Sequence, residues 1–211
     1  MTDVPVVEGA LYRAVKRAYH ALRGLPDRAL RGRRYRAAVQ QLGAIGAPRT
    51  ILVVCHGNIC RSPYMAAVLQ RAMPSVRVSS AGFTGAGRPA PENSLIASAK
   101  RGLDLRSFRS RPIRIDVARR SDLVIVMDAT QRDRLVRMMK VSPKRIVIAG
   151  DLDPTAAATR GVVDPWQKSI DVFESTFDRL DRCAATLVDT VWQTTLPPRA
   201  SADGAGLAFD Q

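Results

Sequence analysis

The sequence predicts an α/β fold in which a four-stranded parallel sheet is flanked by helices. Short apolar, β-branched runs alternate along the chain with segments of helical periodicity, and this alternation is typical of a doubly wound sheet. The length of 211 residues fits one domain with appendages. The expected strands are residues 51–54, 76–79, 123–127 and 146–149, and the expected helices are residues 63–73, 91–102, 130–139 and 168–191.

Residues 1–48 are expected to form a basic helical extension and linker ahead of the sheet. Residues 9–23 place apolar side chains on one face and Arg or Lys elsewhere, which predicts an amphipathic helix. Asp27 suits an N-cap, and residues 28–42 are expected to form a second, more basic helix that ends near Gly43. We expect these helices to pack on the rest of the chain, with docking on an acidic partner or an anionic membrane as the alternatives.

The net charge and its distribution along the chain bear on whether the protein binds nucleic acid. The chain has a formal net charge of +14, half of it in residues 1–49, which hold ten Arg or Lys and three acids. Only 5% of residues are aromatic, and no basic stretch alternates with aromatic residues as a stacking platform for single-stranded nucleic acid would. Nucleic-acid binding is therefore not expected as the main function.

Cysteine usage and hydropathy favour a cytoplasmic protein. Three Cys residues show no spacing typical of a disulfide framework. No apolar run approaches the length of a membrane-spanning helix. Beyond Thr195, the Pro, Ser and Gly content predicts a disordered tail over residues 196–211.

The segment 54–63, Val-Cys-His-Gly-Asn-Ile-Cys-Arg-Ser-Pro, has the composition of a phosphate-binding loop with a nucleophile inside it. Cys55 ends an expected strand, and Pro63 suits the first turn of the helix that follows. Backbone N–H groups of such a loop, at a helix N-terminus, bind anions and favour the thiolate form of the cysteine. Arg61 offers a bidentate guanidinium to two phosphate oxygens.

Around this nucleophile we expect the other loop residues to contact the substrate phosphate or shape its site. Gly57 permits close approach of the backbone, Asn58 tolerates left-handed geometry, and the Ser62 hydroxyl is expected to donate to the thiolate. The predicted substrate-binding set in this loop is His56, Gly57, Asn58, Ile59, Cys60 and Ser62. With His20 as the only other histidine, the sequence shows no cluster of metal ligands, and no cofactor is expected.

Together with three downstream motifs, this loop resembles the low-molecular-weight protein tyrosine phosphatases. The motifs are Ser79-Ser80-Ala81-Gly82, residues 121–128 (Ser-Asp-Leu-Val-Ile-Val-Met-Asp) and Asp164-Pro165-Trp166. The resemblance implies a catalytic domain over residues 49–195 with strand order 2-1-3-4, as in flavodoxin-like folds. It also implies hydrolysis of phosphotyrosine and aryl phosphates through a cysteinyl-phosphate intermediate, without a metal.

The resemblance assigns a role to each matching residue. Cys55 would be the nucleophile, Arg61 would stabilise the phosphoryl group, and Asp164 would act as general acid and then as general base. Trp166 would line the pocket for a phenyl ring, and Cys60 would capture an oxidised Cys55 as a disulfide. The implied partners are tyrosine-phosphorylated proteins, among them bacterial tyrosine kinases or polysaccharide-synthesis proteins.

Two alternatives remain open at this point. An arsenate reductase of the same fold passes oxidation to further cysteines, but residues 61–182 contain none. A basic phosphotyrosine-binding or interaction protein would be expected to lack Cys55, Arg61 or Asp164, and all three are present. The chain departs from the family pattern at Met65-Ala66, Phe83 and Phe108, which affects secondary hydrogen bonds and the substrate rim rather than the three main residues.

Overall fold

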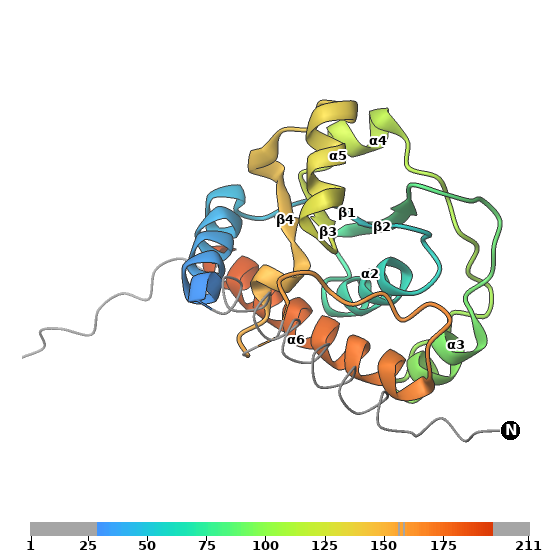
Figure 1. Ribbon diagram of the computed structural model, residues 1–211. Coiled ribbons are helices and arrows are strands. Elements are labelled where there is room, and N and C mark those ends of the chain that lie inside the picture. The colour runs from blue at the N-terminus through green and yellow to red at the C-terminus, as the bar shows by residue number, and fades with distance from the viewer. Residues whose placement is uncertain (1–28, 156, 158, 196–211) are drawn as a thin grey trace, which may run out of the picture.

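The structure is a computed structural model that describes residues 29–155, 157 and 159–195. Its centre is a four-stranded parallel sheet with the order β2-β1-β3-β4, as predicted (Figure 1). In the register of β1 and β2, Cys55 lies opposite Gly82, so the carboxyl ends of both strands meet at one edge. The strands are β1 (Thr50–Cys55), β2 (Arg77–Gly82), β3 (Leu123–Val126) and β4 (Ile146–Ile148).

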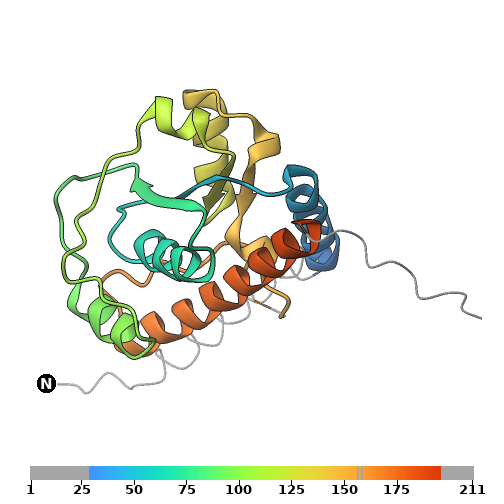
Figure 2. The same ribbon diagram turned by 180° about the vertical axis from the view of Figure 1, so that it is seen from behind.

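Helices cover both faces of this sheet, which explains why its central strands are continuous apolar runs. Side chains of β1 alternate between two cores: Ile51, Val53 and Cys55 enter one, and Leu52 and Val54 enter the other. The first core packs against α2 (Arg61–Ala72), α3 (Glu92–Ala99) and α6 (Ile170–Thr195), and the second against α4 (Ile115–Arg120) and α5 (Ala129–Met139), as Figures 1 and 2 show. Short 3₁₀ turns at Pro143–Arg145 and Ala149–Leu152 flank β4.

Helix α2 is held against α6 by an aromatic contact with a polar end. The rings of Tyr64 and Phe177 stack with centroids 3.7 Å apart, and the Tyr64 hydroxyl donates to Asp181 Oδ1 at 2.6 Å. Tyr64 is fully buried, so its hydroxyl needs such a partner. This contact lies one turn beyond Arg61 and fixes the start of α2, where the candidate site is built.

The described part of the N-terminal extension is a helix, α1, over residues 29–45. Ala38 and Leu42 are buried in the core shared with α2 and α6, and Gln41 Nε2 donates to the carbonyl oxygens of Lys144 and Ile146. The helix continues through Gly43, where the sequence led us to place its end, because Leu42 and Ile45 pack on the core on either side of that glycine. The predicted helix over residues 9–23 and the predicted tail lie outside the described residues.

Helix α4 is the element that the sequence analysis missed. It has six residues, and Ile115 and Val117 are exposed rather than facing the core, so it lacks the apolar stripe by which a helix is predicted. Strand β2 also runs three residues further than predicted, to Gly82. Within the part of the chain that the structure describes, no helix is long and apolar enough to cross a membrane.

Candidate active site

The thiol of Cys55 lies inside a closed turn between β1 and α2. The backbone N–H of Asn58 donates to Cys55 Sγ at 3.2 Å, and the Ser62 hydroxyl donates to the same sulfur at 3.0 Å. Helix α2 follows at once, and its N-cap residue, Cys60, makes no side-chain cap. The first N–H groups of α2 are therefore open to an anion above the sulfur.

The side chain of Asn58 connects the loop to the start of α2, to β2 and to the segment at Arg111. Its φ of +50° places it in the left-handed region, as its residue type allows. The side-chain amide donates to Ser62 Oγ at 2.8 Å and to Ser80 Oγ at 2.9 Å, and its oxygen accepts from the N–H of Arg111 at 2.8 Å. A Cβ at Gly82 would lie 2.8 Å from the Asn58 nitrogen, so only glycine lets β2 come this close.

Arg61 is the cation of the site. The residue is 4% exposed, and Nη1 donates to the carbonyl oxygen of Val162 at 3.1 Å while Nη2 forms an ion pair with Asp164 Oδ2. Its Nε is buried and has no hydrogen-bond partner among the described residues. A buried N–H donor of this kind requires a partner, and an oxygen of a bound phosphate would supply one.

The segment that precedes Asp164 is held by α6. Arg179 donates to the carbonyl oxygens of Gly161 and Thr159, both at 2.8 Å, and its Nε donates to Asp153 Oδ2 at 3.0 Å. Asp153 is only 1% exposed and also accepts from Arg182 at 3.0 Å. Burial raises the pKa of Asp153, but hydrogen bonds from Arg182 and Thr155 lower it by more, so the net pKa lies below its usual value.

These groups meet in a cleft of about 190 Å³ at the carboxyl edge of the sheet. Trp166 forms part of its wall with half of its surface exposed, and its backbone N–H donates to Asp164 Oδ1 at 3.3 Å. The lining residues are Cys55, His56, Gly57, Ile59, Cys60, Arg61, Thr84, Arg88, Asp164 and Trp166.

The structure thus brings eight of the ten predicted site residues to one cleft. Asn58 and Ser62 are fully buried and lie behind it, in contact with Cys55 Sγ and with each other. Their observed contacts are to the nucleophile, and their contact with substrate stays a prediction. Ser62 does not cap α2, whose N-cap residue is Cys60, and its hydroxyl donates to Cys55 Sγ instead.

The other thiols differ from Cys55 in their surroundings. Burial raises the pKa of Cys60 to about 12, with further increases from Asp164 and Cys55. Burial likewise raises the pKa of Cys183, in α6, to about 12. All three cysteines are free. Cys60 and Cys183 are therefore neutral thiols at physiological pH, whereas Sγ of Cys55 receives two hydrogen bonds.

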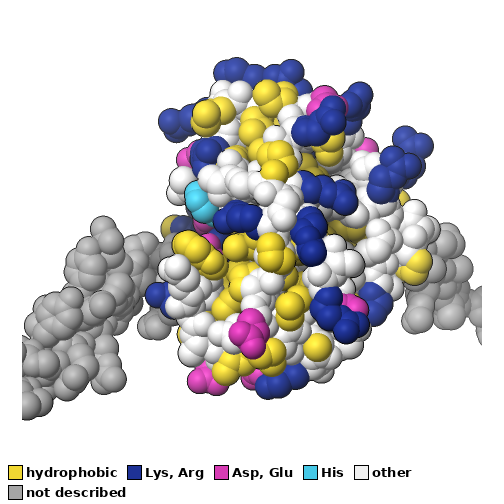
Figure 3. Space-filling view, turned by 90° about the vertical axis from the view of Figure 1, so that its right-hand side faces the viewer, with side chains coloured by type: hydrophobic (Ala, Val, Ile, Leu, Met, Phe, Trp, Pro, Cys, Tyr) yellow, Lys and Arg dark blue, Asp and Glu magenta, His cyan; other side chains and the backbone are white. Residues whose placement is uncertain are grey.

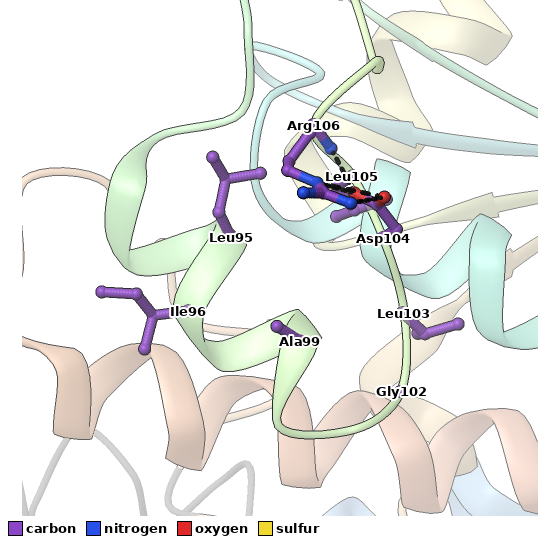
Figure 4. A pocket seen from close by; sticks show the side chains of 8 residues that line it. All are labelled: Leu95, Ile96, Ala99, Gly102, Leu103, Asp104, Leu105 and Arg106. Atoms are coloured by element: carbon purple, nitrogen blue, oxygen red, sulfur yellow. Dashed lines mark hydrogen bonds and ion pairs between the residues drawn. The ribbon is translucent and has the colours of Figure 1, made fainter.

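A larger groove, of about 480 Å³, lies between α3 and the segment that follows it (Figure 4). Leu95, Ile96 and Leu103 give it an apolar wall, and its only charged side chains, Asp104 and Arg106, bind each other. The described residues that line it include no nucleophile and no unpaired acid or base. The smaller cleft at Cys55 is therefore the candidate active site.

Comparisons with known proteins agree with this geometry. Residues 50–195 match the family described as low molecular weight phosphotyrosine protein phosphatase. The probable low molecular weight protein-tyrosine-phosphatase EpsP of Ralstonia nicotianae is 31% identical over 135 residues, which are 64% of this chain and 90% of that protein. The corresponding enzyme Wzb of Escherichia coli is 33% identical over 135 residues, covering 64% of this chain and 89% of its own.

The chain belongs to the low molecular weight phosphotyrosine protein phosphatase family. It is therefore an enzyme, a protein tyrosine phosphatase. The crystal structure of the Erwinia amylovora tyrosine phosphatase AmsI superposes with a TM-score of 0.63 and 31% identity, covering 67% of this chain and 92% of that one. The YwlE arginine phosphatase of Geobacillus stearothermophilus gives a TM-score of 0.62 at 25% identity and covers 69% and 94% of the two chains.

Within this phosphatase, the residues that depart from the family pattern have ordinary structural roles. Met65 and Ala66 are buried in the core of α2, and Phe108 packs against the same core. The guanidinium carbon of Arg134 lies over the ring of Phe83, 4.0 Å from the ring centroid. None of the four contacts Cys55, Arg61 or Asp164 through a hydrogen bond.

The sequence analysis did not assign four residues that the phosphatase uses to build its site. Ser80 was noted within its motif but not as the partner of Asn58, and Thr84 and Arg88 line the cleft from a loop without a recognised pattern. Arg179 reaches from α6 to the carbonyl oxygens of the segment 159–164, which ends at Asp164 and which we call the acid loop. The glycine of the Ser79–Gly82 motif was the one available signal, because its close approach to Asn58 brings β2 to the loop.

Proposed function

We propose that this phosphatase hydrolyses phosphotyrosine by forming a phosphate ester on Cys55. The Sγ thiolate attacks phosphorus, the bond from phosphorus to the tyrosyl oxygen breaks, and Asp164 protonates that departing oxygen. The N–H groups of the loop and the Arg61 guanidinium stabilise the charge on the phosphoryl oxygens during transfer. Tyrosine leaves, and the phosphoryl group stays on sulfur.

In the second step Asp164, now ionised, takes a proton from a water molecule that attacks the phosphocysteine. The sulfur–phosphorus bond breaks, inorganic phosphate leaves, and the thiolate is restored. The Ser62 hydroxyl, 3.0 Å from Sγ, stabilises the departing thiolate in this step. One carboxyl group thus serves in both steps, as acid and then as base.

The observation that carries this proposal is the buried, unpartnered Nε of Arg61 beside a sulfur that accepts two hydrogen bonds. Sulfur, guanidinium and carboxylate line one cleft, whose wall includes the flat ring of Trp166. A phenyl ring suits this wall and gives the length needed to bring a phosphate down to Cys55. Arg and Lys side chains outnumber acidic ones on the face drawn in Figure 3, which suits an anionic substrate.

A substrate panel tests the proposal. The full chain is assayed in the presence of a metal chelator with a phosphotyrosine peptide, a phosphoserine peptide, phosphoarginine and arsenate with thioredoxin. We expect turnover of phosphotyrosine, at least about a hundredfold above phosphoserine, because the shorter side chain leaves phosphorus short of Sγ. Faster turnover of phosphoarginine, in line with the YwlE likeness, or loss of activity with chelator would contradict the proposal.

We further propose the cytoplasm as the compartment and tyrosine-phosphorylated proteins as the partners. Catalysis needs Cys55 as a free thiol, and a reducing compartment keeps it so. The candidates drawn from the family resemblance, tyrosine kinases and polysaccharide-synthesis proteins, are tested by trapping. A Cys55→Ser variant keeps the cleft but lacks the thiolate, so it is expected to retain phosphorylated partners from a lysate and to release them when vanadate is added.

For Cys60 we propose the protective role that the resemblance implies. Peroxide would convert the Cys55 thiolate to a sulfenic acid, the Cys60 thiol would attack that sulfur, and water would leave as the disulfide forms. The raised pKa of Cys60, about 12, makes this capture slow at neutral pH. Faster irreversible oxidation of Cys55 in Cys60→Ser than in wild type is the expected result, and equal rates would exclude the role.

A further inference from the structure

Arg88 lines the cleft beside the loop that surrounds Cys55. Its Nη2 donates to the carbonyl oxygen of Gly57 at 2.8 Å and to that of Thr84 at 3.1 Å. Its Nε is buried with no hydrogen-bond partner, and no ion pair to an Asp or Glu is formed by this guanidinium among the described residues. The positive charge of Arg88 is therefore directed at the loop backbone and not neutralised by an acid.

One peptide unit connects this cation to the nucleophile. A trans peptide holds its C=O and N–H on opposite sides, and the described residues contain no cis peptide. The carbonyl oxygen of Gly57 accepts from Arg88, and the N–H of the same peptide unit, which belongs to Asn58, donates to Cys55 Sγ at 3.2 Å. The Gly57–Asn58 peptide dipole thus has a cation at its negative end and a sulfur at its positive end.

The surroundings hold Arg88 in this position. The hydroxyl oxygen of the buried Ser110 accepts from the backbone N–H of Arg88 at 3.0 Å, and the backbone N–H of Ser110 donates to the Arg88 carbonyl oxygen at 2.9 Å. A Cβ at Gly85 would lie 2.4 Å from Arg88 Nε, and one at Gly57 would lie 3.0 Å from Nη2. The guanidinium fits between two glycines, so this arrangement depends on both lacking side chains.

The other charged groups around the sulfur do not contact this peptide. Arg61 forms its ion pair with Asp164, and its Nη1 donates to Val162. His56 is exposed at the rim, and its carbonyl oxygen accepts from Phe83 and Thr84. The titratable groups that face Cys55 from the loop, from α2, from the segment after β2 and from the acid loop are His56, Cys60, Arg61, Arg88 and Asp164.

We propose that Arg88 is a positioning residue that holds the Gly57–Asn58 peptide with its N–H on Cys55 and thereby stabilises the thiolate. Arg88 acts through the peptide, and among the described residues its guanidinium donates to backbone carbonyl oxygens and not to the sulfur. The inference rests on the proposed function only in that Cys55 is the nucleophile. Removing the guanidinium removes the hydrogen bond to the Gly57 carbonyl oxygen, which weakens the hydrogen bond that the Asn58 N–H donates to the sulfur.

Alkylation of the folded full chain by iodoacetamide tests this inference without any substrate. The second-order rate at Cys55 is measured from pH 5 to 8 by mass spectrometry, because iodoacetamide reacts with the thiolate. We expect Arg88→Met to react about tenfold more slowly than wild type at pH 6, with the difference closing toward pH 8. Arg88→Lys keeps the charge without the planar fork and is expected to lose about threefold. Arg106→Met is the control, because Arg106 is exposed and, among the described residues, its side chain pairs with Asp104.

Hydrolysis of p-nitrophenyl phosphate gives a second measurement, in which kcat/KM of Arg88→Met should fall by the same factor at pH 6. A wild-type alkylation rate in Arg88→Met at pH 6, or a loss of equal size at every pH, would overturn the inference. If Arg88→Met does not fold, Arg88→Gln, which keeps an N–H donor without charge, replaces it with the same expectation. Because alkylation needs no turnover, this result stands even if wild type fails to hydrolyse phosphotyrosine.

Discussion

The loop that holds Cys55 and the loop that holds Asp164 are fixed by different kinds of contact. Cys55 Sγ receives hydrogen bonds from residues three and seven positions further along the chain, within one strand, turn and helix start. The acid loop is fixed by Arg179 of α6, which lies 18 positions after Gly161 and 26 after Asp153. The sulfur of the nucleophile thus receives its hydrogen bonds from residues close to it in the chain, whereas the segment before the acid is held by charged side chains of a distant helix.

This difference predicts different vulnerabilities. Changes inside the nucleophile loop should affect the chemistry with less effect on folding, because each contact to the sulfur there is a single hydrogen bond without an ion pair. Changes at the anchor of the acid loop should affect folding as well, because Asp153 is a buried carboxylate that depends on its arginines.

The largest effect is expected from Cys55→Ser, which removes the nucleophile and leaves the loop contacts nearly unchanged. Turnover of an aryl phosphate should fall on the order of a millionfold, to background, because serine is a far weaker nucleophile at this pH. Thermal unfolding should match wild type, as expected for a site fixed by backbone geometry. Measurable turnover in a preparation free of wild type would remove Cys55 from its assigned role.

The second largest effect is expected from Asp164→Asn, which tests whether Asp164 is the general acid. We expect kcat to fall about a hundredfold with phenyl phosphate, since the departing oxygen then leaves without a proton. With p-nitrophenyl phosphate the loss should be smaller, because that leaving group is stable as an anion. The measurement is kcat against leaving-group acidity, and an equal loss for both substrates would show that Asp164 is not the acid.

Arg179→Met tests whether the position of the acid loop depends on its contacts with Arg179, which we call its anchor. We expect kcat to fall about tenfold with the same leaving-group dependence as Asp164→Asn, and the free energy of unfolding to fall by about 3 kcal/mol. Arg182→Met is the matched control, because Arg182 also donates to Asp153 but makes no contact with the carbonyl oxygens of the acid loop. If both variants have the same kcat, the anchor does not position Asp164.

Ser62→Ala makes the corresponding change in the nucleophile loop. Loss of one hydrogen bond to Sγ, worth about 1 kcal/mol, should lower kcat about fivefold where hydrolysis of the phosphocysteine limits turnover. Burst kinetics with p-nitrophenyl phosphate separate the two steps, and the slower phase should carry the loss. A larger loss in the burst phase would assign Ser62 to the first step instead.

The smallest expected effect is the contribution of Asp153 to the pH dependence of the free energy of unfolding. Because the pKa of Asp153 in the folded chain lies below its usual value, the unfolded chain binds this proton first as the pH falls. The contribution of Asp153 is therefore complete above about pH 4 and is lost as the pH falls below that value. Urea unfolding of wild type and Asp153→Asn from pH 2 to 6 measures this dependence, and parallel curves would contradict it.

The same comparison explains what the sequence could and could not predict. The strands and the nucleophile loop follow from short-range patterns: β-branched runs, glycine and asparagine where the backbone is tight, and proline at a helix start. The strand order came from the family resemblance instead. Asp164 was found through a local motif, but its anchor was not, because nothing in the sequence around Arg179 distinguishes it from the other 27 arginines of an Arg-rich chain. Arg88 was missed for the same reason, since its role depends on a peptide 31 positions away.

The most direct test of the central claim is the site of phosphorylation during turnover. The full chain is mixed with p-nitrophenyl phosphate, quenched in acid within the burst phase, digested and examined by mass spectrometry, with Asp164→Asn used to slow the second step. We predict one phosphoryl group on Sγ of Cys55, absent from Cys55→Ser. Phosphate on Ser62 or His56, or turnover without any phosphorylated enzyme, would contradict the account.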